Sequence, residues 1–134
     1  QLARDFGSQE KPAQIFAGAR SADRLYFIDE CRAIADVHIA TDDGSAGFNG
    51  RVTDALRSYL ETLDAETLAR TEFYNCGPEP MIHAAEAVQR DFVEPAKMFS
   101  AIDYTTKCGV GICGACASPD GRRICVDGPF ITTQ

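Results

Sequence analysis

The residues of this chain best suited to chemistry are cysteines near its C-terminal end. Cys108, Cys113 and Cys116 follow the spacing C-x4-C-x2-C, and Cys125 comes eight residues after Cys116. This is the plant-type arrangement in which four thiolates bind a [2Fe–2S] cluster. The spacing therefore predicts a [2Fe–2S] centre with these cysteines as its ligands.

Glycines separate these cysteines, at Gly109, Gly111 and Gly114. Three ligands from one tight loop must converge on a small inorganic core, and bulky side chains would hold the backbone away. Glycine adopts unusual backbone conformations at little steric cost and leaves peptide N–H groups free to point at the sulfurs. We expect the fourth ligand, Cys125, to come from a separate element and close the site.

Three other interpretations of this segment remain open. Disulfides are disfavoured because Cys31 and Cys76 lie far away in apolar surroundings, and nothing else in the chain is typical of a secreted protein. Structural zinc sites usually offer two C-x2-C pairs, and here Cys113 and Cys116 form the single one. A phosphate loop matches G-x-G-x-x-G over 109–114, but that motif needs a strand before it and a helix after it.

Composition limits the classes of protein to which the chain can belong. Its 134 residues allow one ordinary domain or two small ones, and 45% hydrophobic with 25% charged residues is typical of a soluble globular protein. A net charge of −7 argues against nucleic-acid or anionic-membrane partners. No apolar run approaches the ~18 residues that span a bilayer. Six cysteines without a disulfide framework favour a reducing, cytoplasmic compartment, and the missing initiator methionine indicates a piece of a longer chain.

The first two thirds of the chain alternate between short apolar runs and helical periodicity. Strand, helix, strand, helix, strand, helix is the order that gives an α/β fold with a parallel sheet and right-handed crossovers. The sequence therefore predicts an α/β fold with a parallel sheet. The expected strands are 13–18, 36–41 and 72–76, and the expected helices are 22–33, 52–60 and 81–92.

A glycine lies at or just after the end of each of these strands, and two acidic residues follow the second strand. Ligands of parallel sheets bind beyond the carboxyl ends of the strands, where glycine allows close approach and carboxylates can hold ribose hydroxyls. Any one of these segments alone is more often an ordinary turn, but three at successive strand ends favour a nucleotide site. The segments are Gly18–Arg20, Thr41–Gly44 and Cys76–Pro78.

The helical periodicity ends at Val93–Pro95, which predicts a nucleotide-binding domain over 1–94 and a cluster module over 95–134. In this module 97–102 is a candidate strand leading into the cysteine loop. We expect a β-hairpin between 115–118 and 122–126, because Pro119-Asp-Gly121 has turn chemistry. The hairpin would bring Cys125 back toward Cys116.

Together these residues resemble the electron-transfer subunits of NAD-dependent dihydroorotate dehydrogenases, within the ferredoxin-reductase-like flavoprotein superfamily. The resemblance covers nearly the whole chain. Its most specific part is the coupling of Cys76-Gly-Pro-x-x-Met81 to an all-cysteine [2Fe–2S] module. It rests on 18–20, 36–45, 76–81 and the cysteine run ending at Pro129.

The resemblance implies a set of cofactors and partners. Such subunits carry FAD on an N-terminal β-barrel, bind NAD at the Rossmann-like domain and hold the cluster at the C-terminal end. Electrons from dihydroorotate oxidation reach the cluster from FMN in a catalytic partner subunit, then pass through FAD to NAD⁺, in pyrimidine biosynthesis. The chain would thus be one component of an oxidoreductase hetero-oligomer. Because the cofactors do the redox chemistry, no residue here need act as a catalytic acid or base.

The matching motifs also assign roles to individual residues. Cys76, Gly77 and Pro78 would lie near the nicotinamide, and Arg20, Asp42 and Asp43 near the rest of the nucleotide. The flavin barrel and the first strand and glycine-rich turn of the nucleotide domain have no counterpart here. The resemblance therefore implies a partial Rossmann-like parallel sheet, and the FAD site is expected mainly outside this chain. The implied cofactor-binding set is Gly18, Arg20, Asp42, Asp43, Gly44, Cys76, Gly77, Pro78 and Met81.

Two alternative functions remain. Related subunits of NADPH-linked ferredoxin or sulfide oxidoreductases often have Asp where this chain has Cys108, and the Asp42–Asp43 pair would repel a 2′-phosphate, so NAD is favoured. A non-catalytic zinc-binding scaffold is the alternative of another class. It predicts bound zinc and no redox response.

Overall fold

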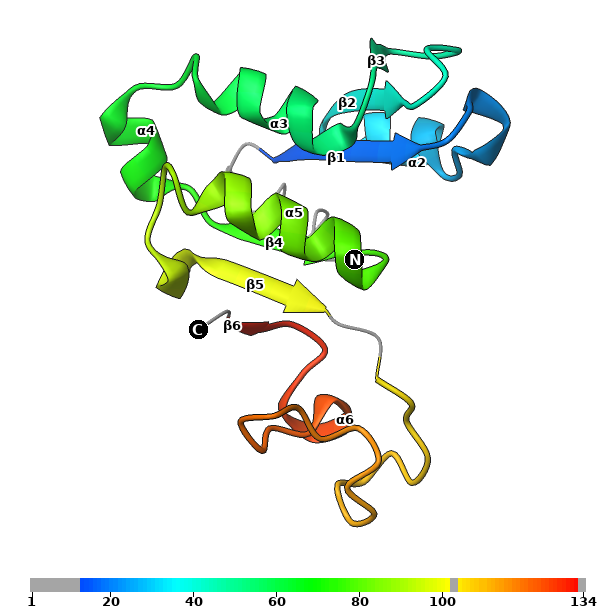
Figure 1. Cartoon of the computed structure of the whole chain (residues 1–134), viewed down its shortest axis with the longest axis vertical. Coiled ribbons are helices and arrows are strands. Elements are labelled where there is room, and N and C mark those ends of the chain that lie inside the picture. Colours follow the sequence, from blue (N-terminus) through cyan, green and yellow to red (C-terminus); the bar gives the residue numbers. More distant parts are fainter. Residues whose placement is uncertain (1–12, 102–103, 133–134) are drawn as a thin grey trace. The chain divides into compact units, whose positions relative to one another are not determined.

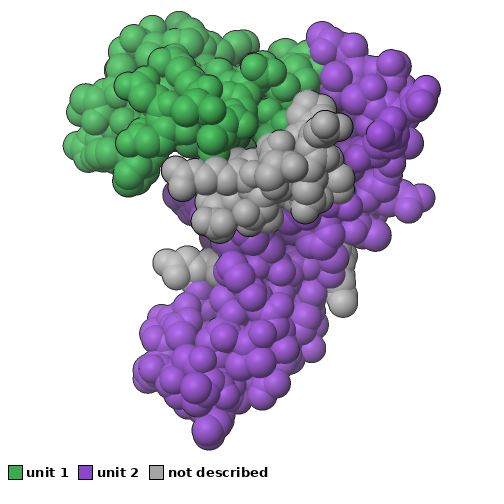
Figure 2. Space-filling view, turned by 180° about the vertical axis from the view of Figure 1, so that it is seen from behind, with its two compact units in different colours: residues 1–59 green, residues 60–134 purple. Residues whose placement is uncertain are grey.

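The computed structural model describes residues 13–101 and 104–132 (Figure 1). The chain divides into two compact units, residues 1–59 and 60–134, which Figure 2 distinguishes by colour. Each unit is described by itself. In the described part of the chain, no helix has both the length and the apolar character needed to cross a bilayer.

The first unit is built on a three-stranded parallel sheet. Its strands are β1 (Gln14–Ala19), β2 (Asp36–Thr41) and β3 (Phe48–Asn49), in that order. β1 and β2 pair along their full length, from Gln14 opposite Asp36 to Ala19 opposite Thr41. The sequence predicted β2 with these same bounds. It did not predict β3, whose two residues are too few to show a period.

The prediction of one continuous helix over 22–33 is wrong. The structure instead has a 3-10 turn, η1 (Ala22–Arg24), and a short helix, α2 (Ile28–Arg32). Leu25 is extended between them, and Phe27 adopts the left-handed conformation with φ 58°. Aromatic residues such as Phe27 have only modest helix propensity, so the apolar spacing alone did not sustain a helix here.

The sheet of the first unit carries an aromatic cluster on β1 and β2. The rings of Phe16 and His38 stack with centroids 4.5 Å apart, and Tyr59 packs against both. The imidazole Nε2 of His38 lies 2.7 Å from Oε1 of Gln14. His38 is therefore a packing residue of this sheet.

The second unit contains a mixed sheet of β4 (Phe73–Cys76), β5 (Met98–Ala101) and β6 (Ile131–Thr132). β4 and β5 are parallel, whereas β5 and β6 are antiparallel. The helix α5 (Glu79–Gln89) packs on β4 and β5 (Figure 1). Ile82 and Met98 are fully buried in this core.

The helices of the second unit differ from expectation mainly at their ends. α5 begins two residues before the expected Met81, because Pro80 is tolerated in the first turn of a helix, and it ends at Gln89. The helix α4 (Ala65–Arg70) was not predicted, although its N-cap Asp64 accepts a hydrogen bond of 2.7 Å from the Thr67 N–H. The remaining elements of this unit are η2 (Pro95–Lys97) and α6 (Ile124–Asp127), whereas α3 (Val52–Leu60) belongs to the first unit except for its last residue.

The domain boundary expected near Pro95 stays a prediction. β5 lies beyond that point and pairs with β4 before the chain enters the cysteine segment. The cysteine segment lies between β5 and β6, so both of its ends attach to one sheet (Figure 1).

Candidate metal centre and nucleotide pocket

The cysteine loop follows the backbone course that its glycines allow. Gly109, Gly111 and Gly114 have φ of 71°, 75° and 70°, a region that residues with a side chain rarely adopt. The backbone therefore adopts the left-handed conformation at three positions between Cys108 and Cys116. Of the cysteines in this segment, Cys116 is buried.

Peptide N–H groups of the loop are directed at the first cysteine. The Cys113 N–H donates to Cys108 Sγ over 3.5 Å. This bond, together with N–H groups of Val110 and Ile112, lowers the pKa of the Cys108 thiol to about 6. Cys108 is consequently held largely as a thiolate at neutral pH, and the thiolate is the form that binds metal.

Cys116 and Cys125 form a second sulfur pair. The N–H and thiol of Cys125 bond to the Cys116 sulfur and lower the pKa of Cys116, while the same contact raises the pKa of Cys125. The Gly111 N–H acts on Cys125 in the opposite direction and lowers its pKa. Negative charge on Cys108 raises the pKa of both thiols, so the pairs lie within electrostatic range of each other.

A tight turn returns the chain to Cys116. The Ser118 N–H donates to the Arg122 carbonyl at 2.8 Å, and the Ile124 N–H donates to the Cys116 carbonyl at 3.1 Å. The hairpin expected over 115–126 is therefore present as a turn with a single β-bridge, Ala117 to Arg123.

The prediction that the second strand of the hairpin runs over 122–126 is wrong beyond Arg123. The chain forms α6 there, and Cys125 lies on this short helix. The Asp127 carboxylate accepts the Arg123 N–H at 2.7 Å, which satisfies a backbone donor at the start of the helix. A local side-chain bond of this kind outweighs weak strand propensity.

The donor chemistry of the segment fits an iron–sulfur cluster. The thiols form two neighbouring pairs, and several N–H groups point at the sulfurs, as outer-shell donors do in such centres. Among the described residues, no three His, Cys, Asp or Glu side chains already surround a single metal position. The structure thus brings the four predicted cysteines into one segment as two pairs.

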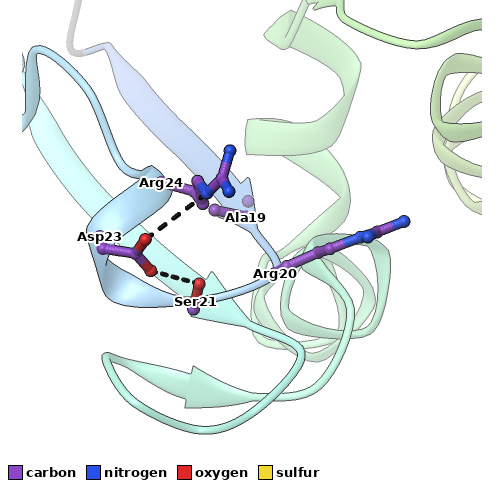
Figure 3. A pocket seen from close by; sticks show the side chains of 6 residues that line it. Ala19, Arg20, Ser21, Asp23 and Arg24 are labelled. Atoms are coloured by element: carbon purple, nitrogen blue, oxygen red, sulfur yellow. Dashed lines mark hydrogen bonds and ion pairs between the residues drawn. The ribbon is translucent and has the colours of Figure 1, made fainter.

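A pocket of about 500 Å³ lies at the carboxyl end of β1 (Figure 3). Arg24 and Asp23 form an ion pair of 3.5 Å there, and the Ser21 hydroxyl also contacts Asp23. The predicted residue Arg20 points away from Asp23 in Figure 3. Sequence reasoning missed Arg24, although it follows the strand end by only a few residues. The lining residues are Gly18, Ala19, Arg20, Ser21, Asp23 and Arg24.

The carboxyl end of β2 joins the same edge of the sheet. The N–H groups of Asp42 and Asp43 each donate over 3.1 Å, to the carbonyls of Ala19 and Arg20. The Asp43 carboxylate accepts from the hydroxyl and N–H of Ser45, which lowers its pKa. The structure therefore brings together the predicted residues of the first unit, namely Gly18, Arg20, Asp42, Asp43 and Gly44.

Gly18 has a packing role as well as a predicted binding role. A Cβ added at Gly18 would lie 2.7 Å from Cβ of Val52, the first residue of α3. The absence of a side chain therefore lets the helix approach the end of β1 closely.

The remaining predicted residues lie together in the second unit. Cys76 ends β4 and is exposed, Gly77 has φ 148°, and Pro78 is the N-cap of α5. The Met81 side chain occupies the space that a Cβ on Gly77 would need. Cys76, Gly77, Pro78 and Met81 are thus one local turn.

Comparison with protein-family models gives two matches. Residues 1–87 match the oxidoreductase NAD-binding domain. The chain belongs to this family. Residues 105–134 match the iron–sulfur cluster binding domain of dihydroorotate dehydrogenase B. The chain therefore matches both an NAD-binding domain and an iron–sulfur cluster binding domain, and the resemblance inferred from its sequence is confirmed.

Curated relatives carry names that agree with both domains. The probable dihydroorotate dehydrogenase B (NAD(+)) electron transfer subunit of Methanocella arvoryzae is 41% identical over 117 residues, which are 86% of this chain and 43% of that protein. The corresponding subunit of Fusobacterium nucleatum is 32% identical over 136 residues, 96% of this chain and 49% of that protein. The chain spans about half the length of the curated relatives it matches.

A solved structure shares the fold of this chain. It is the NADH-dependent reduced ferredoxin-NADP oxidoreductase, described in connection with flavin-based electron bifurcation. The TM-score is 0.73 at 27% identity, and the match covers 98% of this chain and 46% of that chain. The fold class predicted from the sequence, a ferredoxin-reductase type of NAD domain followed by a cluster module, is confirmed.

Proposed function

We propose that this chain is the NAD-binding and cluster-binding portion of an electron-transfer subunit of NAD-dependent dihydroorotate dehydrogenase. Its role is to link dihydroorotate oxidation in a catalytic FMN subunit to NAD⁺, within pyrimidine biosynthesis. The observation that carries the proposal is a cysteine loop with N–H groups directed at its sulfurs, in a chain with an NAD-binding oxidoreductase domain.

Cys108, Cys113, Cys116 and Cys125 would hold the cluster, which supplies one-electron transfer when bound. The lowered pKa of Cys108 favours the ligating thiolate, and the surrounding N–H groups stabilise negative charge on sulfur. Several donors come from the loop backbone, so their positions depend on its left-handed turns rather than on side-chain rotamers.

The nucleotide would bind at the carboxyl ends of the strands. Arg20 and Arg24 offer positive charge to a pyrophosphate at the β1 pocket, and Asp42 offers a carboxylate to ribose hydroxyls. Asp43 is less suited, because its carboxylate is occupied by Ser45. The turn beginning at Cys76 would face the nicotinamide.

The wider assembly follows from the relatives' names and length. FAD would bind mainly on the part of the relatives that this chain does not span. The partner would be the FMN-containing catalytic subunit, in a cytoplasmic hetero-oligomer.

Anaerobic purification tests the cluster directly. We expect visible absorption that bleaches with dithionite, together with iron and acid-labile sulfide in equal amounts. A colourless protein with tightly bound zinc would overturn the proposal in favour of a zinc-binding scaffold.

A second candidate is a subunit of an NADPH-linked ferredoxin oxidoreductase, favoured by the match to the ferredoxin-NADP oxidoreductase structure. Affinity purification from the native cell distinguishes the two. Recovery of a dihydroorotate dehydrogenase catalytic subunit supports the first, whereas a glutamate-synthase-like partner would support the second.

A further inference from the structure

Arg123 connects the two segments that carry the predicted cluster ligands. Its Nη1 donates a hydrogen bond of 2.9 Å to the carbonyl of Gly111, in the loop between Cys108 and Cys113. Its Nε lies 3.7 Å from the Asp127 carboxylate on α6, the helix that carries Cys125. One guanidinium therefore contacts the loop and the helix at once.

Gly111 is the point at which these contacts meet. Its carbonyl accepts from Arg123, and its N–H is directed at the Cys125 sulfur. A Cβ on Gly111 would lie 2.7 Å from Val126 Cγ2 and 3.1 Å from Arg123 Nη1. Arg123 thus packs against the face of Gly111 that has no side chain, and the bond to the carbonyl fixes the direction of the peptide.

The neighbouring arginine has a different set of contacts. The Arg122 guanidinium pairs with Asp120 at 2.6 Å and donates to the Thr132 hydroxyl at 3.1 Å and carbonyl at 2.9 Å. These bonds tie the turn to β6 rather than to the cysteine loop. Adjacent residues of the same type therefore have separable roles, and the loop contact belongs to Arg123.

We propose that Arg123 is a positioning residue for the cluster, which clamps Gly111 to α6 and places a positive charge beside the cysteines. This inference rests on the proposed cluster ligands. Reduction of a cluster adds a negative charge, and a nearby cation stabilises that charge. The net charge and hydrogen bonding around a cluster are the levers that set its potential. Arg123 therefore raises the reduction potential and slows the loss of iron.

Two substitutions separate the clamp from the charge. Arg123→Gln removes the charge and shortens the side chain. Arg123→Lys keeps the charge but offers a single ammonium in place of the planar fork that reaches Gly111 and Asp127 together. Arg70→Gln, at the exposed end of α4, is the matched control for the loss of one positive charge from the chain.

The full chain is purified anaerobically, and its visible absorption is followed under excess chelator. The midpoint potential is measured by redox titration with electron paramagnetic resonance. For Arg123→Gln we expect iron loss about tenfold faster, the lower range for outer-shell substitutions, and a lower midpoint potential. For Arg123→Lys we expect faster iron loss with a potential near that of the unsubstituted chain. Arg70→Gln should match the unsubstituted chain in both measurements.

The possible outcomes are distinguishable. An unsubstituted chain without iron and sulfide overturns the proposed function and this inference together. A loaded chain whose Arg123→Gln variant matches Arg70→Gln in iron loss and potential overturns the inference alone. If Arg123→Lys has the same lowered midpoint potential as Arg123→Gln, the positive charge at this position does not raise the potential, and that part of the inference is wrong. If circular dichroism shows that Arg123→Gln does not fold, the rate of iron loss from Arg123→Lys tests the clamp instead. A rate equal to that of the unsubstituted chain would overturn the inference.

Discussion

The side-chain amides of Asn75 and Gln89 exchange two hydrogen bonds, of 2.9 and 2.8 Å, between β4 and α5. Asn75 also donates to the Ser100 hydroxyl at 3.3 Å, and this hydroxyl donates to Glu86 at 2.6 Å. All four side chains are buried, and Asn75 directly precedes Cys76. This buried network fixes the end of β4 from which the Cys76 turn departs.

Breaking the amide pair should destabilise the second unit. Gln89→Leu leaves the buried Asn75 amide without its partner, which costs about 1–3 kcal/mol of unfolding free energy. Denaturant titration measures this loss. Ala87→Leu, at an exposed position of α5, is the control and should change stability by less than about 0.5 kcal/mol. Adding Asn75→Leu to Gln89→Leu should cost less than the sum of the single changes, and strict additivity would contradict the pairing.

The glycines of the cysteine loop should differ in their tolerance of a methyl group. Gly109 and Gly111 have nearly equal φ, 71° and 75°, so alanine carries a similar backbone cost of about 1–2 kcal/mol at either position. Only at Gly111 would the new Cβ also meet Val126, at 2.7 Å, because the space beside Gly109 is open to 4 Å. We expect Gly111→Ala to retain much less iron per chain than Gly109→Ala. Equal iron contents would show that backbone conformation alone, without packing, limits these positions.

Cys125 provides the test of the fourth predicted ligand. Cys125→Ser should abolish or alter the visible spectrum of the cluster, while far-UV circular dichroism remains that of the folded chain. Cys31→Ser is the control, since Cys31 lies on α2 in the first unit, and the spectrum of this variant should be unchanged. A Cys125→Ser protein with an unaltered spectrum and full iron content would remove Cys125 from the ligand set.

The turn before Cys125 should resist acid. The Arg122 guanidinium, followed by the Ser118 hydroxyl, lowers the pKa of Asp120 from 3.8 to about 2. Because the folded pKa is the lower one, the ionised carboxylate stabilises the turn above pH 3.8, and this contribution disappears as the pH falls through about 2. Carbon NMR of the Asp120 carboxyl in the iron-free chain should show this midpoint. In Arg122→Gln the midpoint should move up toward 3.8, and a midpoint unchanged by that substitution would exclude Arg122 as the cause.

The parts of the molecule that were predictable from sequence are those governed by local pattern. The apolar run Asp36–Thr41 was predicted with its observed bounds, and the cysteine spacing placed Cys108 and Cys116 in one loop. The break at Phe27 was not predictable, because the spacing of Leu25 and Ile28 suits a helix equally well as a turn followed by one.

The polar network and the Arg123 clamp could not be read from the sequence for a different reason. Asn75, Gln89 and Ser100 come from three separate elements, and only the pairing of β4 with β5 and the packing of α5 bring them together. Arg123 and Gly111 are twelve residues apart, and no sequence period marks their contact. Contacts of this kind are set by tertiary structure.

The pairing of β5 with β6 has a consequence for the evolution of such chains. Ser100 lies opposite Ile131, so the cysteine segment leaves and re-enters the sheet at adjacent points (Figure 1). Because the cost of closing a loop grows only slowly with its length, a short hairpin turn could replace the segment with little change in the strands that carry it. The cysteine segment is therefore an insertion between β5 and β6 on which the pairing of these strands does not depend. A redox centre can be gained or lost at this position while the nucleotide-binding scaffold keeps its architecture.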